Sequence, residues 1–203
     1  MPAQGTAPEA ADRAGLQKIN VKLLLELPPG FDHDVLLGIF GRWRLDPGEE
    51  ILDLADYGHV EDGPGCLMLS HRWQFGIDHA GGVPGLFYAT RKGLSGDLAE
   101  RLAQAIAGFL AKAQRLAAEP TFPRGVVLRC GELEVTLNDR LQAPNTDAMD
   151  ATVRPALDQV LRRLYGSSDV RVEREKDPSR RLGYRVHAPA SGLSLAELAR
   201  RLA

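Results

Sequence analysis

The chain has 203 residues, of which 44% are hydrophobic and 26% charged, and these values are typical of a globular protein with its own core. The formal net charge of −2 argues against nonspecific nucleic-acid binding. Cys66 and Cys130 are the only cysteines, too few by themselves for a disulfide framework or a four-ligand zinc site. No apolar run approaches the roughly 18 residues that a membrane span needs, so we expect a cytoplasmic protein with no membrane partner.

Residues 1–17 are expected to form a flexible tail. They lack the basic start and the apolar stretch of a secretory signal, and they are rich in Ala, Pro and charged residues. A second break falls at 119–125, where two prolines and a glycine disfavour both helix and strand. It divides the rest of the chain into an N-terminal α+β half (18–120) and a C-terminal α+β half (121–203), or marks a loop within one continuous domain.

The N-terminal half predicts the order βαβββα. Short apolar runs bounded by turn residues indicate strands, and apolar stripes at helical spacing indicate helices, one capped by Asp32 and the other by Ser95 or Asp97. Glycines and a proline between the last two strands predict a hairpin with a long loop. The expected strands are 19–27, 51–56, 66–78 and 86–92, and the expected helices are 33–45 and 98–118.

The C-terminal half predicts the order ββαββα. A two-residue turn at Cys130-Gly131 is expected to join strands 126–129 and 132–137. A helix then begins after Thr146 and ends at Gly166, with a kink or break at Pro155. A hairpin of 170–175 with 181–187 and a helix over 195–202 complete the chain. Because hairpins dominate, the sequence predicts an α+β fold with largely antiparallel sheets, helices on one face and the order βαβββα-ββαββα.

The segment 66–78 carries the main functional hypothesis. In one continuous strand, alternation places His71, Trp73 and Phe75 on the same face. This arrangement predicts an aromatic-walled pocket with His71 as its polar anchor, as in many small-molecule sites. The alternative is a core histidine whose ring nitrogens bond to backbone or water.

Four further residues extend this predicted site. Asp56 and Tyr57 precede the strand, and Asp78 ends it. Arg91 and Lys92 end the partner strand, where they could meet an anion or form a solvated strand end. The predicted ligand-binding residues are therefore His71, Trp73, Phe75, Tyr57, Asp56, Asp78 and Arg91.

Metal and cofactor motifs are absent from the sequence. A 13-residue strand would separate His59 from His79 by roughly 40 Å, and no pair of histidines has helical ligand spacing. The chain contains neither a GxSxG elbow nor a phosphate-binding P-loop. We therefore expect no metal and no cofactor, and assign no catalytic residue.

Two segments resemble a family of bacterial proteins without an established activity. They are "DLADYGHVEDGPGCLMLSHRWQFGIDHAGGVPGLFYATRK" and "TLNDRLQAPNT", and the resemblance spans most of the chain past the tail. It implies no reaction. In this chain Arg72 stands where the family pattern often has an acidic residue, which weakens a histidine–carboxylate role. The resemblance places these residues in the shared pattern: Asp56, Tyr57, Gly63, Pro64, Gly65, His71, Asp78, Gly85, Arg91 and Asn138.

Three functions are compatible with this sequence. The first is a non-enzymatic protein that binds a small molecule or a protein partner at the surface around His71. The second is a small enzyme in which His71 is the general acid or base, oriented by Asp56 or Asp78. The third is a structural or assembly subunit that exposes the apolar stripe of helix 98–118 in a homodimer.

Overall fold

The computed structural model describes residues 15–48, 50–58, 60, 63–167, 169–189 and 193–202. His59, as well as residues 1–14 of the predicted tail, lies outside this part. Leu16 is buried, and the Gln17 side chain forms two hydrogen bonds with the backbone of Leu94, at 2.8 and 2.9 Å. The packed structure therefore includes Leu16 and Gln17, which the sequence had assigned to the tail.

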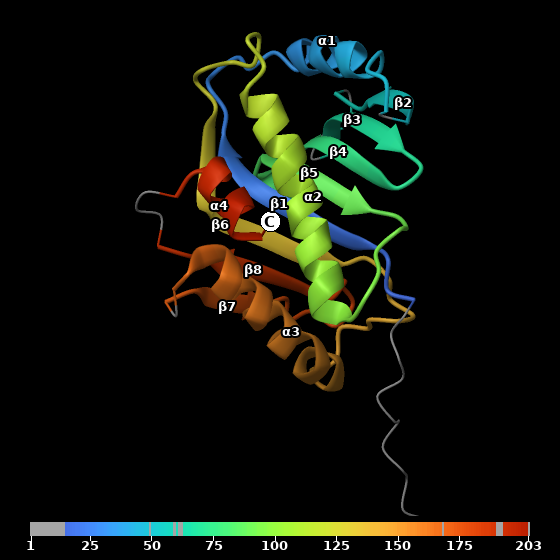
Figure 1. Ribbon diagram of the computed structural model, residues 1–203, viewed down its shortest axis with the longest axis vertical. Helices are drawn as coiled ribbons and strands as arrows, with labels where there is room; N and C mark the ends of the chain where they lie inside the picture. Colours follow the sequence, from blue (N-terminus) through green and yellow to red (C-terminus); the bar gives the residue numbers. More distant parts are fainter. Residues whose placement is uncertain are drawn as a thin grey trace, which may run out of the picture.

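Within the described residues, eight strands form one antiparallel sheet in the order β2-β3-β4-β5-β1-β6-β8-β7 (Figure 1). Strand β1 pairs with β5 on one side and β6 on the other, so strands from both predicted halves share this sheet. The α+β prediction with an antiparallel sheet is confirmed. The strands are β1 (Ile19–Glu26), β2 (Ile51–Asp56), β3 (Pro64–Ser70), β4 (Trp73–Asp78), β5 (Gly85–Thr90), β6 (Val127–Leu137), β7 (Arg171–Arg174) and β8 (Gly183–His187).

The helices cover one face of this sheet (Figure 1). They are α1 (Asp34–Trp43), α2 (Leu98–Ala117), α3 (Asp147–Tyr165) and α4 (Leu195–Leu202). Asp97 and Glu100 form a reciprocal capping box at the start of α2, which satisfies backbone N–H groups that have no partner within the helix. Helix α3 runs through Pro155 and ends at Gly166, which has a φ of 65°. Among the described helices, none combines the length and apolar character needed to cross a membrane.

The apolar stripe of α2 is buried within the chain itself. Leu102, Ile106 and Phe109 have no exposed surface, and Leu116 is equally buried. These side chains pack onto the sheet and the neighbouring helices. The stripe that motivated the homodimer hypothesis therefore has an intramolecular partner.

The largest differences from the sequence prediction concern two turns. The segment 66–78 is not one strand: β3 ends at Ser70, and the chain reverses through His71 and Arg72 before β4 begins. The Ser70 hydroxyl accepts a hydrogen bond from the Arg72 N–H at 3.0 Å, which closes this turn. Conversely, the predicted hairpin at Cys130-Gly131 is the continuous strand β6, with a register shift against β1 between Leu23 and Leu25.

A carboxylate ties the end of α1 to the chain that follows α2. The Trp43 indole donates a hydrogen bond to Glu119 Oε1 at 2.5 Å, and Arg42 pairs with Glu119 Oε2 at 2.9 Å. The Trp43 hydrogen bond, and then the Arg42 guanidinium, lower the pKa of the Glu119 carboxyl below its usual value of 4.5. The ionised form of Glu119 therefore stabilises the fold.

We expect Glu119→Gln to reduce the acid sensitivity of the fold. Because the folded-state pKa is lowered, the stabilisation is complete above pH 4.5 and is lost as the pH falls through the folded pKa. The variant should be less stable than the wild type at pH 7 and should lose less stability between neutral and acidic pH. Urea melts at several pH values give the free energy of unfolding of each protein as a function of pH. The same pH dependence in wild type and variant would contradict this role of Glu119.

Candidate functional site

The sheet face opposite the helices carries a basic depression with a volume of about 490 Å³. Trp73 and Phe75 point toward the helices: Lys112 of α2 lies 4.4 Å from the Trp73 ring centre, and the Phe75 and Phe40 ring centres are 5.9 Å apart. Because side chains alternate along a strand, Gln74 faces the other way, as does Ala89, which is paired with it. Gln74 and Ala89 line the depression.

Four basic side chains surround the basic depression. Lys18 precedes β1, His71 lies in the β3–β4 turn, and Arg91 and Lys92 follow β5. Within the described part of the chain, the side chains of Lys18, Arg91 and Lys92 form no ion pair or hydrogen bond. Three basic side chains therefore meet at one hollow, which is the charge arrangement of an anion-binding site.

The other lining groups are neutral. Thr90 is committed to the fold, since its hydroxyl donates to Gln17 O at 2.6 Å and accepts from Ile19 N–H at 2.9 Å. Asn138 is held at the rim by its backbone N–H, which donates to Lys18 O at 2.8 Å. The side-chain amides of Asn138 and Gln74 make no hydrogen bond with other described residues, so both can bind a ligand.

His71 lies at the rim of the basic depression and outside the core. Its side chain is 49% exposed, and its Nε2 is 3.5 Å from Oε1 of Glu50, which is 78% exposed. The prediction that His71 shares an apolar face with Trp73 and Phe75 is wrong, because the chain turns at His71 before those residues. The depression has no aromatic wall from Trp73 or Phe75.

The structure brings together two of the seven predicted site residues. His71 and Arg91 line the basic depression. Asp78 instead pairs with Lys22 at 2.9 Å on the same sheet face, with both side chains largely buried. Asp56 ends β2 opposite Cys66, and Tyr57 follows it, so both lie at the far ends of β2 and β3 from the His71 turn.

The predicted site residues did not include Lys18, Lys92, Gln74 or Asn138, although Lys92 had been considered beside Arg91 as a possible anion contact and Asn138 belonged to the shared family pattern. Apart from Gln74, these residues flank strand ends: Lys18 precedes β1, Lys92 follows β5 and Asn138 follows β6. Antiparallel pairing places the start of β1 beside the ends of both neighbours. Their residue types can be read from the sequence. Their grouping depends on the order of the strands in the sheet, which the sequence does not give.

A histidine pair lies at the other end of β3. The rings of His33 and His79 are edge to face, with centres 5.0 Å apart, and the buried Nδ1 of His33 has no hydrogen-bond partner among the described residues. Burial, and then the carboxylates of Asp56 and Asp34, raise the pKa of the nearby Cys66 thiol to about 12. That thiol is therefore protonated at neutral pH. Over the described ranges, no three His, Cys, Asp or Glu side chains form a group that could hold a metal ion.

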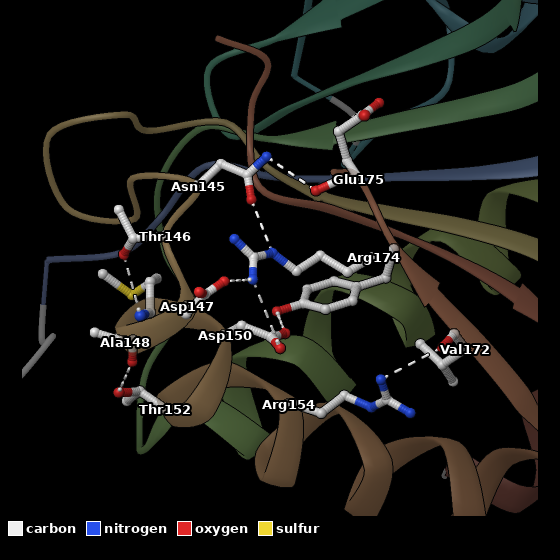
Figure 2. A network of polar contacts seen from close by, with 12 residues as sticks. Asn145, Thr146, Asp147, Ala148, Asp150, Thr152, Arg154, Val172, Arg174 and Glu175 are labelled. Carbon is white, nitrogen blue, oxygen red and sulfur yellow. Dashed lines mark hydrogen bonds and ion pairs between the residues drawn. The ribbon is translucent and has the colours of Figure 1, made fainter. Parts of the chain in front are cut away.

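A polar network holds the loop after β6 against the β7–β8 hairpin. Figure 2 shows Arg174 at its centre, between Asn145 and the first turn of α3. The Arg174 guanidinium donates to Asn145 Oδ1 at 2.9 Å and to Asp147 Oδ1 at 2.6 Å. Asn145 in turn donates to the carbonyls of Glu175 and Asp177. This network holds the end of the loop that begins at Asn138, a residue that lines the basic depression.

No protein-family model matches this chain, and no curated protein matches it at a significant level. The basic depression is therefore the feature of this chain that points to a function.

Proposed function

We propose that the protein is a cytoplasmic binding protein that holds a small anionic ligand in the basic depression without catalysing a reaction. The observation that carries this proposal is the convergence of Lys18, Arg91 and Lys92 on one hollow with no ion-pair partner among the described residues. Like charges held together repel one another, and an anion relieves that repulsion through charge-assisted hydrogen bonds. The volume lies within the roughly 300–1,000 Å³ typical of small-molecule sites.

The test is a calorimetric titration with inorganic phosphate, sulfate and citrate at low ionic strength. We expect the wild type to bind at least one of these anions, with an affinity that falls as salt is added. Arg91→Gln should weaken binding by about tenfold, because it removes a charge-assisted hydrogen bond. Arg185→Gln is the matched control: Arg185 is an exposed arginine of β8 that pairs with Glu134 at 3.1 Å and does not line the depression. Absence of binding by the wild type, or equal losses in both variants, would refute the proposal.

A second candidate function is an acid–base enzyme that acts on the bound anion. It is favoured by the 3.5 Å separation between His71 Nε2 and Glu50 Oε1 at the rim of the depression. In this arrangement Glu50, and neither Asp56 nor Asp78, is the carboxylate that could orient the imidazole.

Glu50→Gln separates the two candidates. For either candidate, the change removes a negative charge beside the cations and should tighten phosphate binding by about threefold, so turnover is what distinguishes them. For an enzyme, it removes the group that orients His71 and should abolish turnover of the substrate. Phosphate affinity by calorimetry gives the first readout, and unchanged or weaker binding would contradict the expected tightening.

A further inference from the structure

The charge of the basic depression selects among classes of anion. Lys18, Arg91 and Lys92 are positive at neutral pH, and Glu50 is the one carboxylate that the described residues place beside His71. The net positive charge of these side chains is therefore greater than a ligand with a single carboxylate could neutralise. A phosphate monoester carries a charge of about −1.5 to −2 at pH 7 and presents three terminal oxygens. These oxygens can meet cations that come from separate chain segments, before β1 and after β5.

The neutral side chains of the depression favour a ligand that has hydroxyl groups in addition to a phosphate. Gln74 and Asn138 each present a side-chain amide to the depression, with two N–H donors and one carbonyl acceptor. A fully ionised inorganic anion accepts hydrogen bonds and leaves the amide acceptors unmatched. A hydroxyl group both donates and accepts, so it can satisfy either end of an amide.

The remaining lining residues disfavour a flat aromatic ligand. Leu52, which is 44% exposed, and Ala89 are the apolar residues that line the hollow. Apart from the His71 imidazole, the described lining contains no aromatic ring on which a nucleobase could stack. An aliphatic carbon skeleton needs no such platform.

We infer that the ligand is a phosphorylated polyol of the size of a sugar phosphate. This inference rests on the proposed function. The phosphate lies against Lys18, Arg91 and Lys92, and the hydroxyl groups pair with the amides of Gln74 and Asn138.

The first experiment compares ribose 5-phosphate, ribose, inorganic phosphate, AMP and citrate by calorimetry at one pH and ionic strength. Ribose 5-phosphate should bind about tenfold more tightly than inorganic phosphate, because each hydroxyl–amide pair adds to the binding. Ribose alone should give no measurable binding, and AMP should bind more weakly than ribose 5-phosphate. If citrate, inorganic phosphate or AMP binds as tightly as ribose 5-phosphate, the inference fails while anion binding stands. If no anion binds, the proposed function fails as well.

The second experiment removes the two amides. Gln74→Ala combined with Asn138→Ala should lower the affinity for ribose 5-phosphate to that for inorganic phosphate, whose own affinity stays unchanged. Asn138 is anchored through its backbone N–H, so truncation of its side chain leaves that hydrogen bond intact. Each single variant should give part of the same selective loss, which makes the result independent of whether the double variant folds. Equal losses for both ligands would overturn the assignment of Gln74 and Asn138.

Discussion

Gly76→Ala should destabilise the fold by about 3 kcal/mol, a value at the upper end for overpacking a core with one extra carbon. A Cβ at Gly76 would lie 2.0 Å from the backbone carbonyl oxygen of Cys66 and 2.8 Å from a methyl group of Leu67. The close neighbour is backbone on the adjacent strand β3, so no change of rotamer relieves the clash. Strand β3 would have to move, and the edge strand β2, which pairs only with β3 in the sheet, would move with it.

Gly38→Ala is the matched control for this prediction. Gly38 lies in α1 on an exposed surface, and a Cβ added there meets no atom within 4 Å. Alanine restricts the unfolded chain and favours a helix, so this variant should gain about 0.5–1 kcal/mol. Guanidinium melts of both variants give the comparison. A Gly76→Ala protein as stable as the wild type would show that β3 and β4 are not packed as described.

The helices could be predicted from sequence because their signals are local. Leu36, Ile39, Phe40 and Trp43 recur at helical spacing, and all four are buried in α1. Ser95 and Asp97 were both visible as caps for α2, and the structure has Asp97 there, in a capping box with Glu100. Each of these signals involves residues only a few positions apart.

The turn between β3 and β4 could not be predicted in this way. It consists of His71 and Arg72, and neither is one of the glycine, asparagine, aspartate or proline residues that usually mark a tight hairpin. The error at Cys130-Gly131 is the opposite one, because this pair contains a glycine typical of a turn but lies inside the continuous strand β6. The pairing of β6 with β1 is irregular nearby. A turn without turn residues was therefore missed, and a glycine inside a strand was taken for a turn. The missed turn at His71 led to the incorrect prediction of an aromatic pocket.

The basic depression depends on sheet order, which no local pattern encodes. Arg91, with Lys92 beside it, was predicted as a possible anion contact from its place at the end of a strand. Its neighbours Lys18 and Asn138 became recognisable only once β1 was seen to lie between β5 and β6. The sequence therefore predicted which residues lie at strand ends, but it could not predict which strand ends lie side by side in the sheet.

Arg174→Met should destabilise the protein by about 2 kcal/mol, because it leaves buried polar groups without their partner. Asn145 is buried, and its Oδ1 accepts from Arg174 at 2.9 Å. Asp150 lies 3.9 Å from the same guanidinium and accepts a hydrogen bond from Tyr184 at 2.9 Å. Burial, and then this bond to Asp150, raise the pKa of Tyr184 well above its usual value, so its hydroxyl stays protonated and remains the donor.

The control for Arg174→Met lies on the same strand. Arg171 is 75% exposed and pairs with Glu173, so Arg171→Met should change stability by no more than about 0.5 kcal/mol. Combining Arg174→Met with Asn145→Ala should cost less than the sum of the two single changes, because both remove the same hydrogen bond. Hydrogen exchange should also show faster opening of residues 138–146 in Arg174→Met and normal opening in Arg171→Met. Because Asn138 belongs to that loop, the same variant should weaken binding of ribose 5-phosphate, although Arg174 does not line the basic depression, and should leave binding of inorganic phosphate unchanged. An unchanged affinity for ribose 5-phosphate would show that the Arg174 network does not support the site.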